Sequence, residues 1–148
     1  IGADAWSVSE TITTLRTTTT QAGGSGPITE LQRLTVSLRG GFEQKDGCLV
    51  FHFTGQLDAY SEKQFITYVM DVLKANAFPT VFDLSKIDFL DSSGLGALVQ
   101  LAKQCNDAKR SFVVVGNARV TQTVKLVRLE AFLHLVNDLE TAYTQLAA

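Results

Sequence analysis

Strand-like and helix-like patterns alternate along most of this chain, and that alternation limits its possible folds more than any other feature. Residues 80–84 (TVFDL) and 111–116 (SFVVVG) are short apolar runs of the kind that form buried strands. Segments with apolar residues at helical spacing precede and follow each run. Strands that alternate with helices form parallel crossover connections, with the helices packed on the sheet. The order of these patterns therefore predicts an α/β domain.

The first two strand patterns make the expected sheet mixed. Residues 34–40 alternate apolar and polar side chains, and residues 48–55 are rich in β-forming residues. The dipeptide Asp46-Gly47 between them is a turn signal, so the two segments are expected to form an antiparallel hairpin. With the later strands added, we expect a mostly parallel sheet of four to five strands.

About four helices are expected to pack on this sheet. Their apolar stripes begin at Ser61, near Gly94, at residue 119 and at Leu139, and the third stripe continues to residue 132. The polar segment 85–89 is expected to link the strand 80–84 to the stretch before the second helix.

Residues 1–33 differ from the rest of the chain. They contain a threonine-rich tract that ends in GGSGP (23–27), with too few apolar residues for a core of their own. We interpret this segment as an extension or linker and residues 34–148 as the folded domain. A linker from another module, a docking arm and a homodimer contact all remain open as roles for it.

Composition argues against several functional classes. The formal net charge of -2, without a cluster of Lys or Arg, disfavours nucleic-acid binding. The sequence has no run of about twenty apolar residues that could span a membrane, and it does not begin with a signal peptide. The two cysteines have no paired spacing, which favours reduced thiols and a cytoplasmic location.

Motifs of catalysis are also missing from the sequence. His52 and His134 are the only histidines, and both lie in apolar, strand-like patterns typical of structural residues. No local motif provides metal ligands, a phosphate-binding loop ending in Gly-Lys-Ser/Thr, or a Gly-x-Ser-x-Gly nucleophile. The sequence thus predicts a binding protein rather than an enzyme, without a metal or cofactor.

The stretch FLDSSGLGAL (89–98) allows two interpretations. Asp91, Ser92 and Ser93 are all suitable caps for the following helix, and Gly94 and Gly96 remove bulk from its first turn. In the first interpretation the stretch is only a polar cap with two packing glycines. In the second, a serine at the helix start is a phosphorylation switch, because a helix N-terminus tolerates negative charge while the surface changes.

The same stretch resembles the signature of bacterial anti-sigma factor antagonists, which are members of the STAS domain family. Similarity to the family extends over roughly residues 34–146. It is carried also by TGQLDAYS (54–61), VFDLSKIDFLDSSGLG (81–96) and VVVGNARVTQTVKLVRLEAFLHLVND (113–138).

This resemblance implies the STAS fold and a partner-switching protein that is a substrate rather than a catalyst. In the family, the unphosphorylated domain binds an anti-sigma factor that is also a serine kinase; phosphorylation releases the kinase, and a serine phosphatase restores binding. The phosphorylated position of the family corresponds here to Ser92, with Ser93 as the second choice, and Asp58 matches a nearby family acid. The resemblance implies one contact patch, made of Gly55, Asp58, Asp91, Ser92, Ser93, Gly94 and Leu95.

Two other functions remain open for the same domain. One is a STAS module that does not switch and serves as a scaffold or as part of a transporter. The other is a small-molecule or nucleotide sensor that uses the same helix terminus. Retention of both serines favours the switch.

Overall fold

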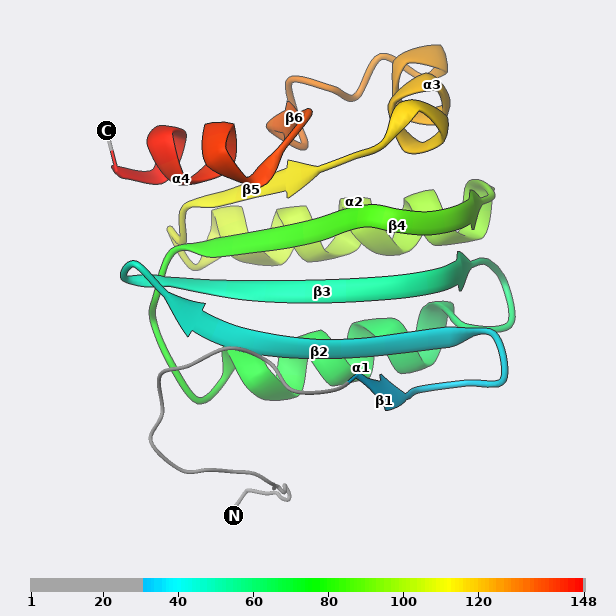
Figure 1. The fold of residues 1–148 in the computed structure, drawn as a ribbon, viewed down its shortest axis with the longest axis horizontal. Helices are drawn as coiled ribbons and strands as arrows, with labels where there is room; N and C mark the ends of the chain where they lie inside the picture. The colour runs from blue at the N-terminus through cyan, green and yellow to red at the C-terminus, as the bar shows by residue number, and fades with distance from the viewer. Residues whose placement is uncertain (1–30, 148) are drawn as a thin grey trace. The chain divides into compact units, whose positions relative to one another are not determined.

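The computed structural model describes residues 31–147, which form a mixed, mostly parallel sheet with helices on both faces (Figure 1). This confirms the expected fold class. The six strands lie in sequence order across the sheet: β1 (Gln32–Arg33), β2 (Leu38–Lys45), β3 (Cys48–Leu57), β4 (Thr80–Leu90), β5 (Phe112–Val115) and β6 (Leu135–Val136). The two-residue strands β1 and β6, one at each edge, raise the count above the expected four to five.

Strand directions follow the expected pattern. β1 is antiparallel to β2, and β2 runs opposite to its neighbour β3 in Figure 1. β3, β4, β5 and β6 are parallel to one another. The carboxyl ends of β3 and β4 therefore lie at the same end of the sheet, where the loops to the next helices begin.

Four helices are present in the part of the chain described here: α1 (Glu62–Leu73), α2 (Ser92–Asp107), α3 (Ala118–Leu126) and α4 (Leu139–Ala147). α1 and α2 lie side by side behind the sheet in Figure 1. They cover an aromatic core that includes Phe51, Phe53 and Phe82, with Phe65 of α1 in edge contact with Phe53 at 4.8 Å between ring centroids. Full burial of one such side chain contributes about 1.5–3 kcal/mol, so this face carries most of the hydrophobic stabilisation.

The opposite face has a smaller core beneath α4. Val50, Val81, Val113 and Val115 from three neighbouring strands pack there with Ala142 of α4. β5 is consequently buried on both faces, which explains its uninterrupted apolar sequence.

The predicted strand at 34–40 is wrong over its first four residues. The amides of Leu34 and Thr35 donate to the carbonyl of Leu38, and the hydroxyl of Thr35 accepts from the amides of Ser37 and Leu38. The segment is a tight turn between β1 and β2. The threonine side chain satisfies backbone donors locally and competes with strand pairing, although the sequence alternates as a strand would.

The predicted link at 85–89 is also wrong, because β4 continues through it to Leu90. Two register shifts against β3 accommodate the extra residues of β4. The side-chain amide of Asn117 donates to the carbonyls of Ser85 and Ile87, at 3.1 and 2.8 Å, in the irregular stretch. The polar residues thus lie in a bulged strand instead of a loop.

The third helix is shorter than the predicted 119–132. α3 ends at Leu126, and Arg128 has a positive φ of 59° that does not continue a right-handed helix. Val127 is half exposed as a result. The helical spacing of apolar residues continues in the sequence beyond Leu126, but the backbone leaves the helix there.

Candidate functional site

The two loops singled out in the sequence meet at the carboxyl ends of β3 and β4. One loop leads from β3 into α1 through Asp58, and the other leads from β4 into α2 through Asp91. The amide of Asp91 donates to the carbonyl of Leu57 at 3.3 Å, which joins the loops directly. Segments more than thirty residues apart in sequence thereby form one surface.

Asp91 alone is the N-cap of α2. Its backbone is extended, its carboxylate oxygen Oδ1 accepts from the amide of Gly94 at 2.9 Å, and its carbonyl accepts from Leu95. Ser92 and Ser93 lie inside the first turn, so the helix begins two residues before the predicted position. The capping interpretation of the stretch applies to Asp91 and leaves both serines available.

The two serine hydroxyls are unused by the fold. Ser92 is exposed and Ser93 is half-buried, and neither hydroxyl has a hydrogen bond to another residue within 31–147. Both lie in the first turn of a sixteen-residue helix, where unpaired amides and the helix dipole favour negative charge. A phosphate on Ser92 is compatible with this arrangement.

The two glycines of the motif have different surroundings. A Cβ at Gly94 would lie 2.2 Å from the carbonyl oxygen of Leu57, so only glycine lets α2 start this close to β3. A Cβ at Gly96 would meet nothing within 4 Å among the described residues, and Gly96 is exposed. A glycine within a helix costs about 1 kcal/mol relative to alanine. The described fold therefore explains why residue 94 is glycine, but not why residue 96 is.

Gly55 is required by the turn between β1 and β2. Its φ is +115°, and a Cβ there would lie 2.0 Å from the carbonyl oxygen of Ser37. The next amide, that of Gln56, donates to the same oxygen at 2.9 Å. Gly55 thus attaches the turn to the end of β3.

Asp58 organises the loop between β3 and α1. It is buried, and its Oδ1 accepts from the amides of Tyr60 and Ser61 at 3.0 and 3.2 Å. The hydroxyl of Ser61, also buried, accepts from the Asp58 amide and donates to the carbonyl of Gln56. The acid matched by the resemblance is therefore held within its own loop. Ser61 was not predicted as a site residue, although a serine before a helix is a recognisable signal.

All seven residues of the predicted contact patch lie in or beside these two loops. Ser92 is the exposed member, and Gly55, Asp91 and Ser93 are partly exposed. Asp58, Gly94 and Leu95 are buried and support the surface from beneath. Their assignment to partner contact stays a prediction.

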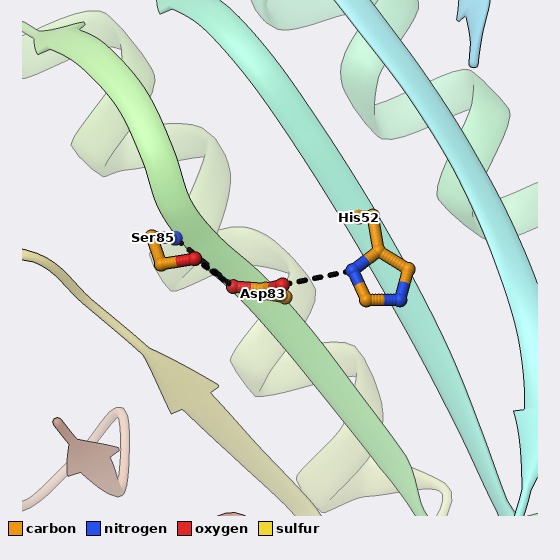
Figure 2. A network of polar contacts seen from close by, with 3 residues as sticks. All are labelled: His52, Asp83 and Ser85. Carbon is orange, nitrogen blue, oxygen red and sulfur yellow. Dashed lines mark hydrogen bonds and ion pairs between the residues drawn. The ribbon is translucent and has the colours of Figure 1, made fainter. Parts of the chain in front are cut away.

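A second polar arrangement, absent from the predicted site, lies further back on β3 and β4 (Figure 2). Nδ1 of His52 is 2.8 Å from Oδ2 of Asp83, and Oδ1 of Asp83 accepts from the amide and hydroxyl of Ser85 at 3.0 and 2.7 Å. Burial alone would raise the pKa of Asp83, but the hydrogen bonds from His52 and Ser85 together lower it. No local sequence signal identifies a pair formed 31 residues apart.

This network does not form a nucleophilic triad. The hydroxyl of Ser85 donates to the carboxylate and not to the imidazole, so the histidine is not placed to take its proton as it does in a Ser-His-Asp triad. The network keeps Asp83 charged and paired inside the sheet. His134 is similarly engaged, with its Nδ1 2.8 Å from the carbonyl of Phe112.

Within the described residues, neither a metal-binding cluster nor an exposed thiol is found. No group of three or more His, Cys, Asp or Glu residues within 31–147 is arranged to hold a metal ion. Cys48 and Cys105 are free and buried, and burial raises the pKa of the Cys105 thiol to about 11. Among these residues, no helix is long and apolar enough to cross a membrane.

Comparisons with known proteins agree with this architecture. An anti-sigma factor antagonist from Mycobacterium paratuberculosis has a TM-score of 0.69 and 25% identity, over 76% of this chain and 96% of that one. The Bacillus cell fate determinant SpoIIAA in its phosphorylated form has a TM-score of 0.56 and 13% identity, over 74% and 99% of the two chains. The murine Slc26a9 anion transporter has a TM-score of 0.63 and 16% identity, over 71% of this chain and 18% of the transporter. At their low identities, the last two show a shared fold.

The family model of the STAS domain matches residues 42–142. The matched segment contains β3, β4, both loops of the candidate site and the start of α2. It covers well over half of the 148 residues. The chain belongs to the STAS domain family.

Proposed function

We propose that this protein is an anti-sigma factor antagonist that binds an anti-sigma factor with serine kinase activity and is released by phosphorylation of Ser92. The single observation that carries the proposal is the unused, exposed hydroxyl of Ser92, in a helix turn already capped by Asp91. The likeness to an antagonist from Mycobacterium and to phosphorylated SpoIIAA supports it.

The switch acts on the surface and leaves the fold intact. Phosphate adds between about -1.5 and -2 charges at neutral pH, beside the carboxylate of Asp91. The amides at the start of α2 and the helix dipole stabilise that charge within the domain. A partner packed against Ser92 meets both the added bulk and the repulsion, and a serine phosphatase restores binding.

In this proposal the protein is the kinase's substrate and has no catalytic role of its own. It acts in the bacterial cytoplasm, where its partner controls a sigma factor. Ser93 is the second candidate for modification, and its half-buried position makes it the less accessible of the two serines.

The test measures binding to each purified anti-sigma factor kinase of the protein's own host. Wild type and Ser92→Ala are expected to bind one of them with similar Kd, and Ser92→Asp at least tenfold more weakly, with all melting temperatures within about 2 °C. Ser93→Asp is the matched control and is expected to weaken binding less. Equal Kd values for wild type and Ser92→Asp would contradict the proposal.

A module associated with a transporter is the second candidate, favoured by the similarity to part of the murine anion transporter. Such a module does not need a phosphorylatable serine. It is expected to bind none of the host's anti-sigma factor kinases, and to bind its own partner with the same Kd whether residue 92 is serine, alanine or aspartate, which separates the two candidates.

No observation favours the nucleotide or small-molecule sensor. Two shallow cavities of the described residues are lined by other parts of the domain. One lies along β1 and α1, near Leu34 and Tyr68, and the other between the ends of α1 and α2, near Cys105. Neither is lined by Ser92 or by another residue of the predicted contact patch.

A further inference from the structure

The C-terminal end of α3 carries an exposed apolar pair between two cations. Leu126 is 78% exposed and Val127 is 50% exposed, and the lysine and arginine that flank them are exposed as well. α3 packs against the sheet through Val120 and Val124, so the apolar pair adds nothing to the core. Single exposed hydrophobic residues are ordinary on protein surfaces, but adjacent ones mark an interaction site. We call residues 125–128 the α3 tip.

The backbone of the α3 tip is held in a Schellman motif. The amide of Arg128 donates to the carbonyl of Lys125 at 3.1 Å. The amide of Leu129 donates to the carbonyl of Val124 at 3.2 Å. The position of Arg128 in this motif is usually glycine, because its φ of +59° is unfavourable for a residue with a Cβ. The chain therefore places a cation where the fold alone favours glycine.

The charge around the α3 tip is entirely positive. Residues 117–129 contain Arg119, Lys125 and Arg128 and no Asp or Glu. Arg119 lies seven residues before Leu126 and so on the same face of α3. None of the three cations forms an ion pair with another residue within 31–147. The helix dipole favours a cation in the last turn, but it does not account for the apolar pair.

We propose that the α3 tip and Arg119 form a contact site for the surface of a bilayer that contains anionic lipids. The apolar pair enters the boundary between headgroups and acyl chains, and the cations lie at the level of the lipid phosphates. This contact is with the surface of the bilayer and does not need a helix that crosses it. The inference is independent of the proposed function.

The residue types favour a lipid surface over a protein partner. Affinity between proteins comes mainly from Trp, Tyr and Arg seated in pockets, and leucine, valine and lysine are under-represented there. The exposed side chains of the tip line neither of the two cavities described above. Leucine and valine between basic residues match the composition of segments that bind at a bilayer surface.

Few residues take part, so the contact is expected to be weak and reversible. Each cation near an anionic surface strengthens binding about fivefold, and three cations give about a hundredfold preference for anionic over neutral lipid. Because salt screens such charges, raising it from about 50 to about 500 mM is expected to weaken binding at least tenfold.

The experiment measures cosedimentation of the full chain with vesicles of equal parts phosphatidylglycerol and phosphatidylcholine, and with vesicles of phosphatidylcholine alone. Arg128→Gly is expected to bind the anionic vesicles about fivefold more weakly. Its melting temperature is expected to stay equal or rise, because glycine relieves the positive φ. Leu126→Gln is expected to bind at least about threefold more weakly, since it removes apolar surface that the bilayer would bury.

The chain offers a matched control for each variant. Lys109 is also exposed, has a positive φ of 57° and lies at the end of α2, before β5. Lys109→Gly therefore removes the same charge from the same backbone conformation at another place. Val36→Gln matches Leu126→Gln, because Val36 is 94% exposed in the turn before β2. Both controls are expected to bind vesicles as the wild type does.

Three results would overturn the inference. The first is no binding of the wild type to anionic vesicles, or equal binding to both kinds of vesicle. The second is an equal loss for Lys109→Gly and Arg128→Gly, which would show attraction by net charge without a defined site. The third is binding to polyglutamate but not to vesicles, which would assign the α3 tip to an acidic polypeptide.

Discussion

Two serines, Ser85 in β4 and Ser92 in the first turn of α2, have opposite surroundings. The hydroxyl of Ser85 is donated to a buried carboxylate that also holds His52, whereas the hydroxyl of Ser92 is exposed and has no bond to another residue within 31–147. In the first region, both carboxylate oxygens of Asp83 are hydrogen-bonded within the sheet, one to His52 and the other to Ser85. In the second region, Asp91 performs the capping and leaves the serine unused. A polar group that the fold does not need is the better candidate for function.

The two glycines extend this comparison and give the largest expected effect on stability. Gly94→Ala is expected to destabilise the domain by about 2–4 kcal/mol, because its Cβ would collide with the carbonyl of Leu57. Gly96→Ala is expected to stabilise it by about 0.5–1 kcal/mol, because the methyl group enters open space and favours the helix. Urea unfolding of both variants measures the difference. Similar losses for both glycines would contradict the description of the helix start.

The buried network is expected to give the next largest effect. Asp83→Ala removes the carboxylate that is bonded to Nδ1 of His52 and accepts from the hydroxyl of Ser85, at a cost of about 1–3 kcal/mol near pH 7. Urea unfolding of wild type and Asp83→Ala at pH 7 measures this cost. Ser92→Ala is the matched control and is expected to lie within about 0.5 kcal/mol of wild type.

The pH dependence of the network follows from the lowered pKa of Asp83. A carboxylate whose pKa is lower in the folded than in the unfolded protein stabilises the fold above its unfolded pKa of about 4. This contribution is lost as the pH falls through the folded pKa. The difference between wild type and Asp83→Ala, measured by urea unfolding from pH 7 to pH 3, is therefore expected to narrow below about pH 4. A difference that grows on acidification would show that the network does not favour the ionised form.

The smallest expected effect concerns the cap. Asp91→Ala removes the acceptor of the Gly94 amide and is expected to cost about 1 kcal/mol, by thermal or urea unfolding. Ser92→Ala is expected to cost less than half of that. If Ser92→Ala cost as much as Asp91→Ala, the serine would be a cap after all, and the contrast between the two serines would disappear.

Sequence reasoning predicted the helices and strands whose apolar residues recur at regular spacing because one or both of their faces are buried. The valines of β5 pack on both faces of the sheet, and the stripe from Phe65 to Leu73 faces the aromatic core, so both segments carry a clear pattern. The turn before Leu38 was missed because its alternation is that of a strand, while a threonine hydroxyl satisfies its backbone. Where the apolar spacing fits both a strand and a turn, local hydrogen bonds determine the structure.

The candidate site was only partly predictable for a similar reason. Asp91 and Ser92 stand in a recognisable motif, but the motif does not say which of them caps the helix. The pairing of His52 with Asp83 depends on the register of two strands, which the sequence does not determine locally. The contrast between Gly94 and Gly96 likewise depends on how closely α2 approaches β3.

The central claim is that Ser92, the more exposed of the two serines that the fold leaves available, is the residue that is phosphorylated. Its most direct test incubates the protein with each purified anti-sigma factor kinase of its host and ATP, and locates phosphate by peptide mass spectrometry. The expected result is one phosphate on Ser92, none on Ser85, and no phosphorylation of Ser92→Ala. Phosphate on another residue of the wild type, or none with any of the kinases, would contradict the account.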